Sequence, residues 1–280
     1  MRQNKLTIPD IRHRKNGTPI AVITAYDYPW ARIADAAGID IVLVGDSLGM
    51  VVLGYPDTVS VTMEEMLHHA KAVVRGIEHA LVVVDMPFGS YNSAIPTAIG
   101  NANRLIKEGR VDAVKVEGGV QMAPTVAAIV RAGIPVQGHI GLTPQTAASL
   151  GGFKVQGKTA EAARQLVDDA RALEDAGCFS IVLEAIPAPL AEHITKAIAI
   201  PTIGIGAGPG CDGQVLVMHD LVGLYDRFTP KFVKQYATLN AQMVAALAQY
   251  KAEVESRAFP GEAHSFTMKA EELDKLLRLY

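Results

Sequence analysis

The sequence predicts an α/β fold, a single (β/α)8 TIM barrel with additional helices at its C-terminal end. From Pro19 to about Asp220, short apolar runs rich in Val and Ile alternate with stretches of helical spacing. About eight such runs occur, which is the number of parallel strands that closes this barrel. We expect the strands near residues 20–24, 40–46, 81–86, 112–117, 135–140, 180–185, 201–205 and 214–218.

Local signals mark where the intervening helices begin and end. Helical spacing over 62–77 and 159–176 follows Thr62 and Thr159, which are suitable N-caps. Four glycines precede expected strands and predict left-handed caps that end helices: Gly38, Gly109, Gly133 and Gly177. These signals repeat as strand-and-helix units and indicate one barrel domain over residues 1–280.

The pattern changes after the last expected strand. A long helix is predicted from Pro230 to about Ser256, a turn at Pro260-Gly261, and another helix from Met268 to Tyr280. This C-terminal helical extension, about 230–280, needs a surface to cover. Both the outside of the barrel and a neighbouring subunit remain open as that surface.

Composition narrows the class of protein. Hydrophobic residues make up 49% of the 280 residues, which suffices for a large core and leaves apolar surface for self-association. A formal charge of -3 without a large basic block argues against nucleic acid binding. The start of the chain is polar, and the apolar runs are too short to span a membrane. The two cysteines, Cys178 and Cys211, are interpreted as reduced thiols. We therefore expect a cytoplasmic protein.

Polar side chains stand at the ends of five expected strands. They are Asp46 with Ser47, Asp85, Lys115 with Glu117, His139, and Glu184. Because the carboxyl ends of parallel barrel strands meet at one face, where barrel enzymes carry their active sites, we expect these side chains to converge. This convergence predicts an enzyme.

Asp46 and Asp85 predict a metal site. Each follows a continuous apolar strand, and two unpaired carboxylates at adjacent barrel positions would repel each other. Mg²⁺ resolves this conflict because it takes oxygen ligands, commonly one or two carboxylates with water and substrate oxygens. Glu117 is a third candidate ligand. The alternative for each aspartate taken singly is capping of the next helix.

Lys115, Glu184 and His139 are candidates for substrate chemistry. Lys115 and Glu117 are two residues apart on a strand, so both side chains face the barrel interior. They form either a structural ion pair or part of a site for an anionic substrate. Glu184 has apolar neighbours in SIVLEAIP, which suits a general base near neutral pH, although it could instead cap the helix after Pro187. His139 either donates to a substrate oxyanion or has a structural role.

Two glycine-rich segments are weaker signals. Residues Gly152–Thr159 match the spelling of a nucleotide-binding phosphate loop, but the preceding GLTPQTAASLG does not resemble a buried strand. The run Gly204–Gly213 lacks GxGxxG spacing and fits close approach of the backbone to a ligand at the barrel mouth. A nucleotide-binding protein therefore stays an alternative, as does a Schiff-base aldolase with Lys115 as the nucleophile.

The ordered motifs of the chain resemble the ketopantoate hydroxymethyltransferase family over nearly the whole length. The matching segments are TAYDYPWARIADAAGID, VGDSLGMVVLGYPDTVSVTMEEMLHH, VVVDMPFGSY, VKVEGG, PVQGHIGLTPQ, FKVQGK, LEAIP, IGIGAG and FPGEAHSF. The resemblance implies a Mg²⁺-dependent barrel that transfers a hydroxymethyl group from 5,10-methylenetetrahydrofolate to 3-methyl-2-oxobutanoate, giving 2-dehydropantoate. It also implies a high-order homo-oligomer, typically a decamer.

The resemblance assigns roles to individual residues. It implies metal ligands at Asp46, Asp85 and Glu117, and contacts to the oxoacid from Asp46, Ser47, Asp85 and Lys115. It implies a proton acceptor at Glu184. Tyr26 and His139 are further candidates for polar contacts with the substrate.

Overall fold

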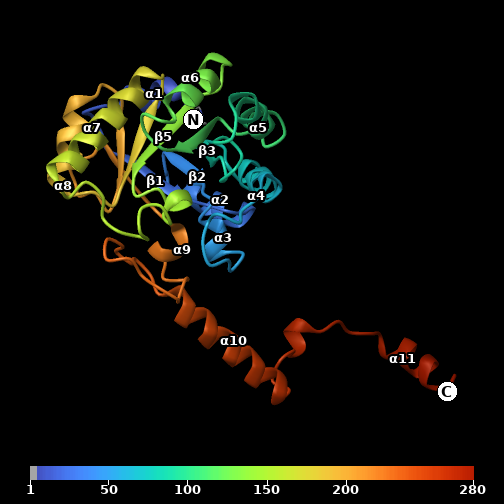
Figure 1. Ribbon diagram of the computed structural model, residues 1–280. Coiled ribbons are helices and arrows are strands. Elements are labelled where there is room, and N and C mark those ends of the chain that lie inside the picture. The colour runs from blue at the N-terminus through green and yellow to red at the C-terminus, as the bar shows by residue number, and fades with distance from the viewer. Residues whose placement is uncertain (1–4) are drawn as a thin grey trace.

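Residues 5–280 are described by the computed structural model, and within them eight strands form one closed barrel in which neighbouring strands are parallel (Figure 1). Strand order follows chain order, and β1 closes the barrel against β8. The predicted barrel is confirmed, and each predicted strand overlaps an observed one. The first four residues of the polar start lie outside the described range. The strands are β1 (Ile20–Thr24), β2 (Ile41–Val44), β3 (Leu81–Asp85), β4 (Ala113–Glu117), β5 (Val136–Gly141), β6 (Ser180–Glu184), β7 (Thr202–Ile205) and β8 (Gly213–Leu216).

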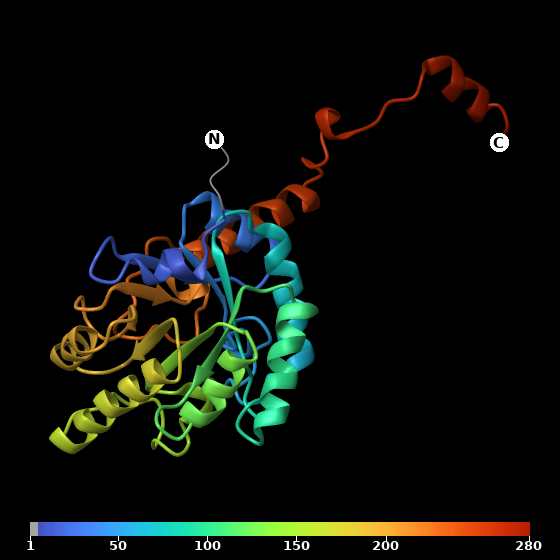
Figure 2. The same ribbon diagram turned by 90° about the horizontal axis from the view of Figure 1, so that it is seen from above.

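Helices surround the barrel and extend beyond it (Figures 1 and 2). Thr62 and Thr159 cap α4 and α7 through their side chains, as predicted, and Glu65 completes a capping box with Thr62. None of the described helices is long and apolar enough to cross a membrane. The helices are α1 (Ile8–Arg12), α2 (Tyr28–Ala36), α3 (Leu48–Val51), α4 (Met63–Gly76), α5 (Ile95–Lys107), α6 (Ala123–Arg131), α7 (Ala160–Asp175), α8 (Ala188–Ala197), α9 (Met218–Leu221), α10 (Leu239–Glu255) and α11 (Ala270–Leu277), with 3-10 turns η1 (Pro144–Thr146) and η2 (Glu262–His264).

The barrel interior changes from apolar to polar along its axis. Near the start of the strands, Ile20, Ile41 and Leu81 form one buried cluster with Ile11 of α1, which closes that end of the barrel. Further along the same inward faces stand Asp85 and Lys115, also buried. Side chains two residues apart on a strand share a face, so the apolar start of each strand anchors its polar end.

Three of the four predicted glycine caps are confirmed. Gly38, Gly133 and Gly177 have φ values of 76°, 88° and 95°, in the left-handed region that glycine enters without a Cβ penalty. The prediction for Gly109 is wrong, because Arg110 holds the left-handed position with φ 60°. A Cβ at Gly109 would lie 2.5 Å from the carbonyl oxygen of Leu105, so close packing accounts for this glycine.

The long C-terminal helix begins later than predicted. Residues from Pro230 to Thr238 are not helical, and α10 starts at Leu239. The backbone N–H groups of Tyr236 and Leu239 donate to the carbonyl oxygens of Leu221 and Val222, at 2.8 and 3.0 Å. These bonds hold the segment extended beside the end of α9 and delay the helix. The predicted second helix is present as α11.

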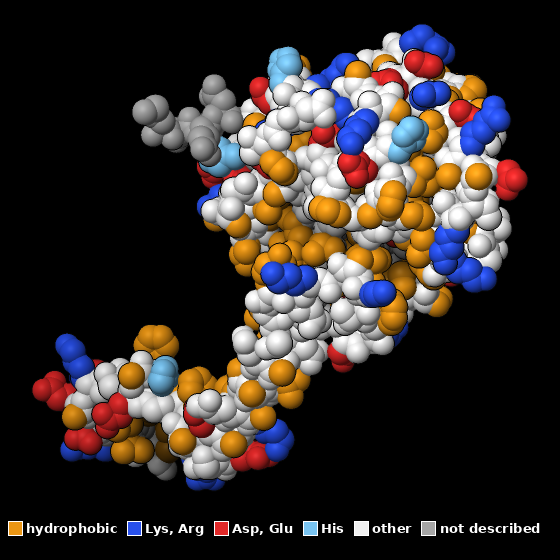
Figure 3. All heavy atoms as spheres, turned by 90° about the vertical axis from the view of Figure 1, so that its left-hand side faces the viewer, with side chains coloured by type: hydrophobic (Ala, Val, Ile, Leu, Met, Phe, Trp, Pro, Cys, Tyr) orange, Lys and Arg blue, Asp and Glu red, His pale blue; other side chains and the backbone are white. Residues whose placement is uncertain are grey.

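From α10 onward the chain forms an arm that leaves the barrel (Figures 1 and 2). No residue of α10 or α11 is buried, although several carry large apolar side chains. Hydrophobic side chains also gather on the barrel where the arm departs (Figure 3). The exposed apolar side chains of the arm include Met243, Val244, Leu247, Tyr250, Val254, Phe266, Leu273 and Leu277. An apolar surface of this kind is typical of a protein contact.

Candidate active site

The predicted site residues converge at the C-terminal end of the barrel. The strand register places Asp85 of β3 opposite Lys115 of β4, and Glu117 of β4 opposite His139 of β5. Glu184 ends β6 and reaches the same cluster through His139. Asp46 and Ser47 follow β2. The carboxyl ends of the strands thus bring together groups that lie far apart in the sequence.

Lys115 and Asp85 form a buried ion pair. Nζ of Lys115 lies 2.8 Å from Oδ1 of Asp85, and both side chains are only 5% exposed. Burial opposes the charge of Lys115, but the carboxylates of Asp85, Glu117 and Asp46 outweigh it and raise the lysine pKa. A protonated amine is not a nucleophile. The Schiff-base alternative is therefore disfavoured by the surroundings of Lys115.

His139 lies between two carboxylates. Its Nδ1 is 3.4 Å from Oε1 of Glu117, and its Nε2 is 3.2 Å from Oε2 of Glu184. Burial and Lys115, whose Nζ is 3.2 Å from Nδ1, oppose protonation, yet the two carboxylates prevail and raise the pKa of His139 to about 9. The imidazole is then cationic at neutral pH, and its charge attracts the carboxylate of Glu184 toward the cluster. Glu184 has this polar neighbour in addition to the apolar ones expected.

Burial and the neighbouring carboxylates disfavour the ionised form of Asp46. Its Oδ2 accepts a hydrogen bond from Nε2 of Gln145 at 2.8 Å, and its backbone N–H donates to Oδ2 of Asp85 at 3.0 Å. Burial, together with the charges of Asp85 and Glu117, raises the pKa of Asp46 well above its usual range. An additional cation at this point would relieve the repulsion.

Gln145 is a central residue that the sequence did not single out. It is 4% exposed and stands in η1, after β5. Its Nε2 donates to Asp46 and to the carbonyl oxygen of Met86, its Oε1 accepts from the hydroxyl of Tyr91 at 2.7 Å, and its N–H donates to Glu117 at 3.1 Å. The one signal in the sequence was its place at the end of the motif PVQGHIGLTPQ.

Tyr26 and Ser47 form the edge of the cluster. The Tyr26 hydroxyl and Oγ of Ser47 are 2.8 Å apart, and Tyr26 is 1% exposed. Burial raises the pKa of Tyr26, despite hydrogen bonding to Ser47. The phenol is therefore neutral and fixes the position of the serine hydroxyl.

The chemistry of the donor set fits one divalent cation. In the described part of the chain, no three His, Cys, Asp or Glu side chains form a group arranged to hold a metal. Glu117 is engaged by His139 and Gln145. Asp46 and Asp85 match the one or two carboxylates that Mg²⁺ uses with water and substrate oxygens. With Asp46 ionised, four carboxylates face the two cations Lys115 and His139, so one divalent cation would balance the charge of the site.

The two glycine-rich segments differ from nucleotide-binding loops in their structural context. No strand leads directly into Gly152–Thr159, because β5 ends at Gly141 and η1 intervenes. This arrangement is unlike a phosphate loop, in which a strand passes straight into the loop and helix. Between β7 and β8, a Cβ at Gly206 would lie 2.7 Å from the ring of Phe232. There the close approach is made by a protein side chain.

Comparisons with known proteins decide the family. A profile described as ketopantoate hydroxymethyltransferase matches residues 5–262. The chain belongs to the ketopantoate hydroxymethyltransferase family. It is 63% identical to the 3-methyl-2-oxobutanoate hydroxymethyltransferase of Heliobacterium modesticaldum, over 95% of this chain and 97% of that one. It is 61% identical to the enzyme of the same name from Oleidesulfovibrio alaskensis, over 95% and 92% of the two chains. The family expected from the motifs is confirmed, and the chain is a transferase.

Solved structures support the fold. The chain resembles a phosphoenolpyruvate phosphomutase from Streptomyces platensis with a TM-score of 0.61 at 16% identity, covering 98% of both chains. It resembles a phosphonopyruvate hydrolase with a TM-score of 0.60 at 12% identity, again over 98% of both. At these identities the likeness concerns the barrel alone.

Proposed function

We propose that the chain transfers a hydroxymethyl group from 5,10-methylenetetrahydrofolate to 3-methyl-2-oxobutanoate, giving 2-dehydropantoate, as a step of pantothenate biosynthesis. Membership of the family and the names of relatives about 60% identical support the acceptor and the reaction class. The observation that carries the proposal is the convergence of Asp46, Asp85, Lys115 and Glu184 at one end of the barrel.

The residues suit a small 2-oxoacid. Lys115 supplies a fixed positive charge in a buried setting, where it stabilises the oxygens of an anionic substrate. Ser47, held by Tyr26, can donate to the substrate carboxylate. Mg²⁺, held by Asp46 and Asp85 with Glu117 as the proposed third ligand, would supply Lewis-acid stabilisation of developing negative charge on the oxoacid.

Glu184 is the proposed base. It is the least buried of the four carboxylates, with a side chain 15% exposed, and His139 orients it through the contact at Oε2. It takes the proton from C3, and the electron pair of that C–H bond passes into the enolate. Water adds to the one-carbon unit of the donor and its two carbon–nitrogen bonds break, which gives tetrahydrofolate, with one proton on each freed nitrogen, and formaldehyde. The enolate carbon attacks the formaldehyde carbon, and the alkoxide that forms takes the proton held by Glu184, which gives the hydroxymethyl group.

We also propose a cytoplasmic homo-oligomer, in line with the decamer that the resemblance implied. The exposed apolar residues of α10 and α11 support association, because a lone subunit would present them to water. Sedimentation of the full chain would test this, with a single species much larger than 29.8 kDa as the expected result. A monomer at micromolar concentration would contradict it.

The test of the reaction is proton NMR of 3-methyl-2-oxobutanoate with the purified protein and 5,10-methylenetetrahydrofolate, with Mg²⁺ or with a chelator. Formation of 2-dehydropantoate that stops with the chelator is expected. Asp85→Ala should weaken oxoacid binding that depends on the metal. Absence of product under every condition would refute the proposed acceptor and donor.

The same samples separate the two alternatives. Borohydride trapping of Lys115 by the oxoacid, with activity retained in chelator, would favour the Schiff-base aldolase. Binding of Mg-ATP that a Lys158→Ala variant abolishes would favour the nucleotide-binding protein. We expect neither result.

A further inference from the structure

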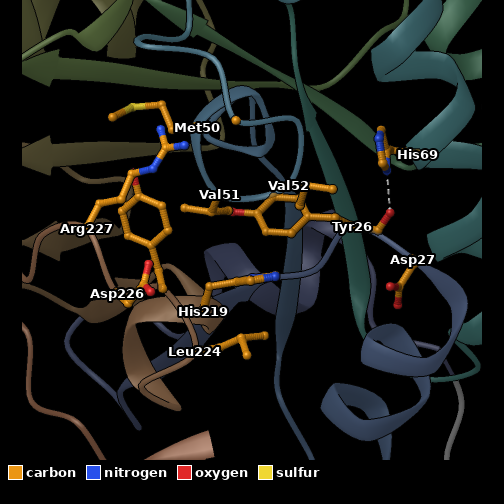
Figure 4. A pocket seen from close by; sticks show the side chains of 12 residues that line it. Tyr26, Asp27, Met50, Val51, Val52, His69, His219, Leu224, Asp226 and Arg227 are labelled. Atoms are coloured by element: carbon orange, nitrogen blue, oxygen red, sulfur yellow. Dashed lines mark hydrogen bonds between the residues drawn. The ribbon is translucent and has the colours of Figure 1, made fainter. Parts of the chain in front are cut away.

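A pocket of about 460 Å³ opens beside the candidate active site (Figure 4). Its walls come from segments that follow β1, β2 and β8, so it lies at the same end of the barrel as the candidate site. Its volume is in the range of sites for small organic ligands. None of the roles proposed so far uses it. The lining residues on which the inference depends are Tyr26, Asp27, Val51, His219, Leu224 and Arg227.

The pocket and the candidate site share Tyr26. The ring of Tyr26 lines the pocket, while its hydroxyl meets Oγ of Ser47 at 2.8 Å. Val51, which also lines the pocket, ends the short helix α3 that starts directly after Ser47. A ligand in this pocket would therefore lie next to the group proposed to bind the oxoacid, as a second substrate must.

The lining suits a flat heteroaromatic ring. Val51 and Leu224 are apolar, and the ring of His219 packs 5.3 Å from that of Tyr26. Nδ1 of His219 is buried without a hydrogen-bond partner among the described residues, and an unsatisfied buried nitrogen is costly unless a ligand meets it. Asp27 uses Oδ1 to cap α2 through Trp30 N–H at 2.9 Å, which leaves Oδ2 for another donor.

The rim carries an unpaired cation. Arg227 is exposed and forms no ion pair with any other residue of 5–280. A guanidinium binds a carboxylate through two parallel hydrogen bonds. The pocket is lined by aromatic and apolar side chains and by Asp27, and Arg227 stands exposed at its rim. This combination matches a planar ring with an N–H donor and an anionic tail.

We propose that this pocket binds the reduced folate donor, with the pteridine ring against Tyr26 and His219 and the glutamate tail at Arg227. Oδ2 of Asp27 accepts a hydrogen bond from the 2-amino group of the pteridine, while Oδ1 keeps its bond to the Trp30 N–H. This inference rests on the proposed function, because it assigns a place to the donor of that reaction.

Calorimetric titration of the full-length protein with 5-formyltetrahydrofolate, a stable reduced folate, tests the pocket. Arg227→Gln should weaken binding about tenfold, since it removes one charge-assisted contact. The same variant should bind 6-methyltetrahydropterin, which lacks the glutamate tail, as tightly as the parent protein does. Asp27→Asn keeps an N-cap and should weaken both ligands at least about fivefold.

Arg131→Gln provides the matched control. Arg131 is an exposed arginine at the C-terminal end of α6, which leads to the start of β5 at the opposite end of the barrel. It should change neither affinity. Unchanged folate affinity in both pocket variants would overturn the assignment, as would a changed subunit number in either, which would identify the pocket as a contact between copies.

Failure of the inference can be told apart from failure of the proposed function. The parent protein could transfer the group from 5,10-methylenetetrahydrofolate while the pocket variants keep normal folate affinity. That result would refute the pocket assignment and leave the proposed function in place. Metal-dependent exchange of the oxoacid C3 proton with no reduced-folate binding by the parent protein would remove the donor, and the pocket assignment with it.

Discussion

Replacing Lys115 with methionine tests the buried ion pair at the centre of the site. Methionine keeps most of the aliphatic length of lysine and removes the charge. Nζ of Lys115 lies 2.8 Å from Oδ1 of Asp85, and each side chain is 5% exposed. The variant therefore leaves the buried carboxylate of Asp85 without its nearest cation. Breaking a buried pair from one side costs about 3–5 kcal/mol.

That loss is large beside the total stability of a protein, which is about 5–15 kcal/mol. Urea unfolding of the parent protein, Lys115→Met, Asp85→Asn and the double variant, all in chelator and at one protein concentration, measures it. The double variant should recover part of the loss, because it leaves neither charge buried alone, and the coupling free energy should be about 1–3 kcal/mol.

A cost below about 1 kcal/mol for Lys115→Met would place the pair in the range of exposed salt bridges. Additive effects of the two substitutions would show that the two charges do not depend on each other. Either result would refute the description of Lys115 as a cation held by its carboxylate neighbours.

Two further predictions concern His139 and Gly141. The pKa of His139 is raised from 6.5 to about 9, so its contribution to the free energy of unfolding is full below pH 6.5 and is lost as the pH rises through 9. The metal-free protein should therefore lose about 2–3 kcal/mol of unfolding free energy across that window. A His139→Gln variant that loses stability equally steeply would contradict this. Gly141 has φ 93°, and a Cβ there would lie 2.2 Å from the carbonyl oxygen of Glu184. Gly141→Ala should therefore lower the free energy of unfolding, measured in urea, by at least about 2 kcal/mol, and it should also slow C3 proton exchange. Gly38→Ala, with φ 76° and open space around it, isolates the backbone strain, and equal losses in the two variants would refute the role given to the Glu184 contact.

The sequence predicted the barrel and the strand-end residues because both depend on short-range patterns. Side chains alternate along a strand, so Lys115 and Glu117 had to share a face once the strand was placed, and the closed barrel then put them beside Asp85 and His139. The family motifs added roles to these positions. None of this required the conformation of a loop.

Features outside that pattern were missed for identifiable reasons. Gln145 reaches the site from a 3-10 turn, and hydrophobic periodicity carries no information on how such a turn folds back. The start of α10 depends on backbone hydrogen bonds to Leu221 and Val222, which are tertiary contacts. Gly109 was taken for a helix cap because of its position, whereas Arg110 adopts the left-handed conformation.

The central claim is that Glu184 is the base that acts on the oxoacid, and one measurement tests it directly. Proton NMR in D₂O with Mg²⁺ follows loss of the C3 proton of 3-methyl-2-oxobutanoate in the parent protein and in Glu184→Gln, with oxoacid affinity measured on the same samples. The account predicts exchange slowed at least about 100-fold in the variant, with affinity changed by less than about threefold. Exchange at the rate of the parent protein would contradict it.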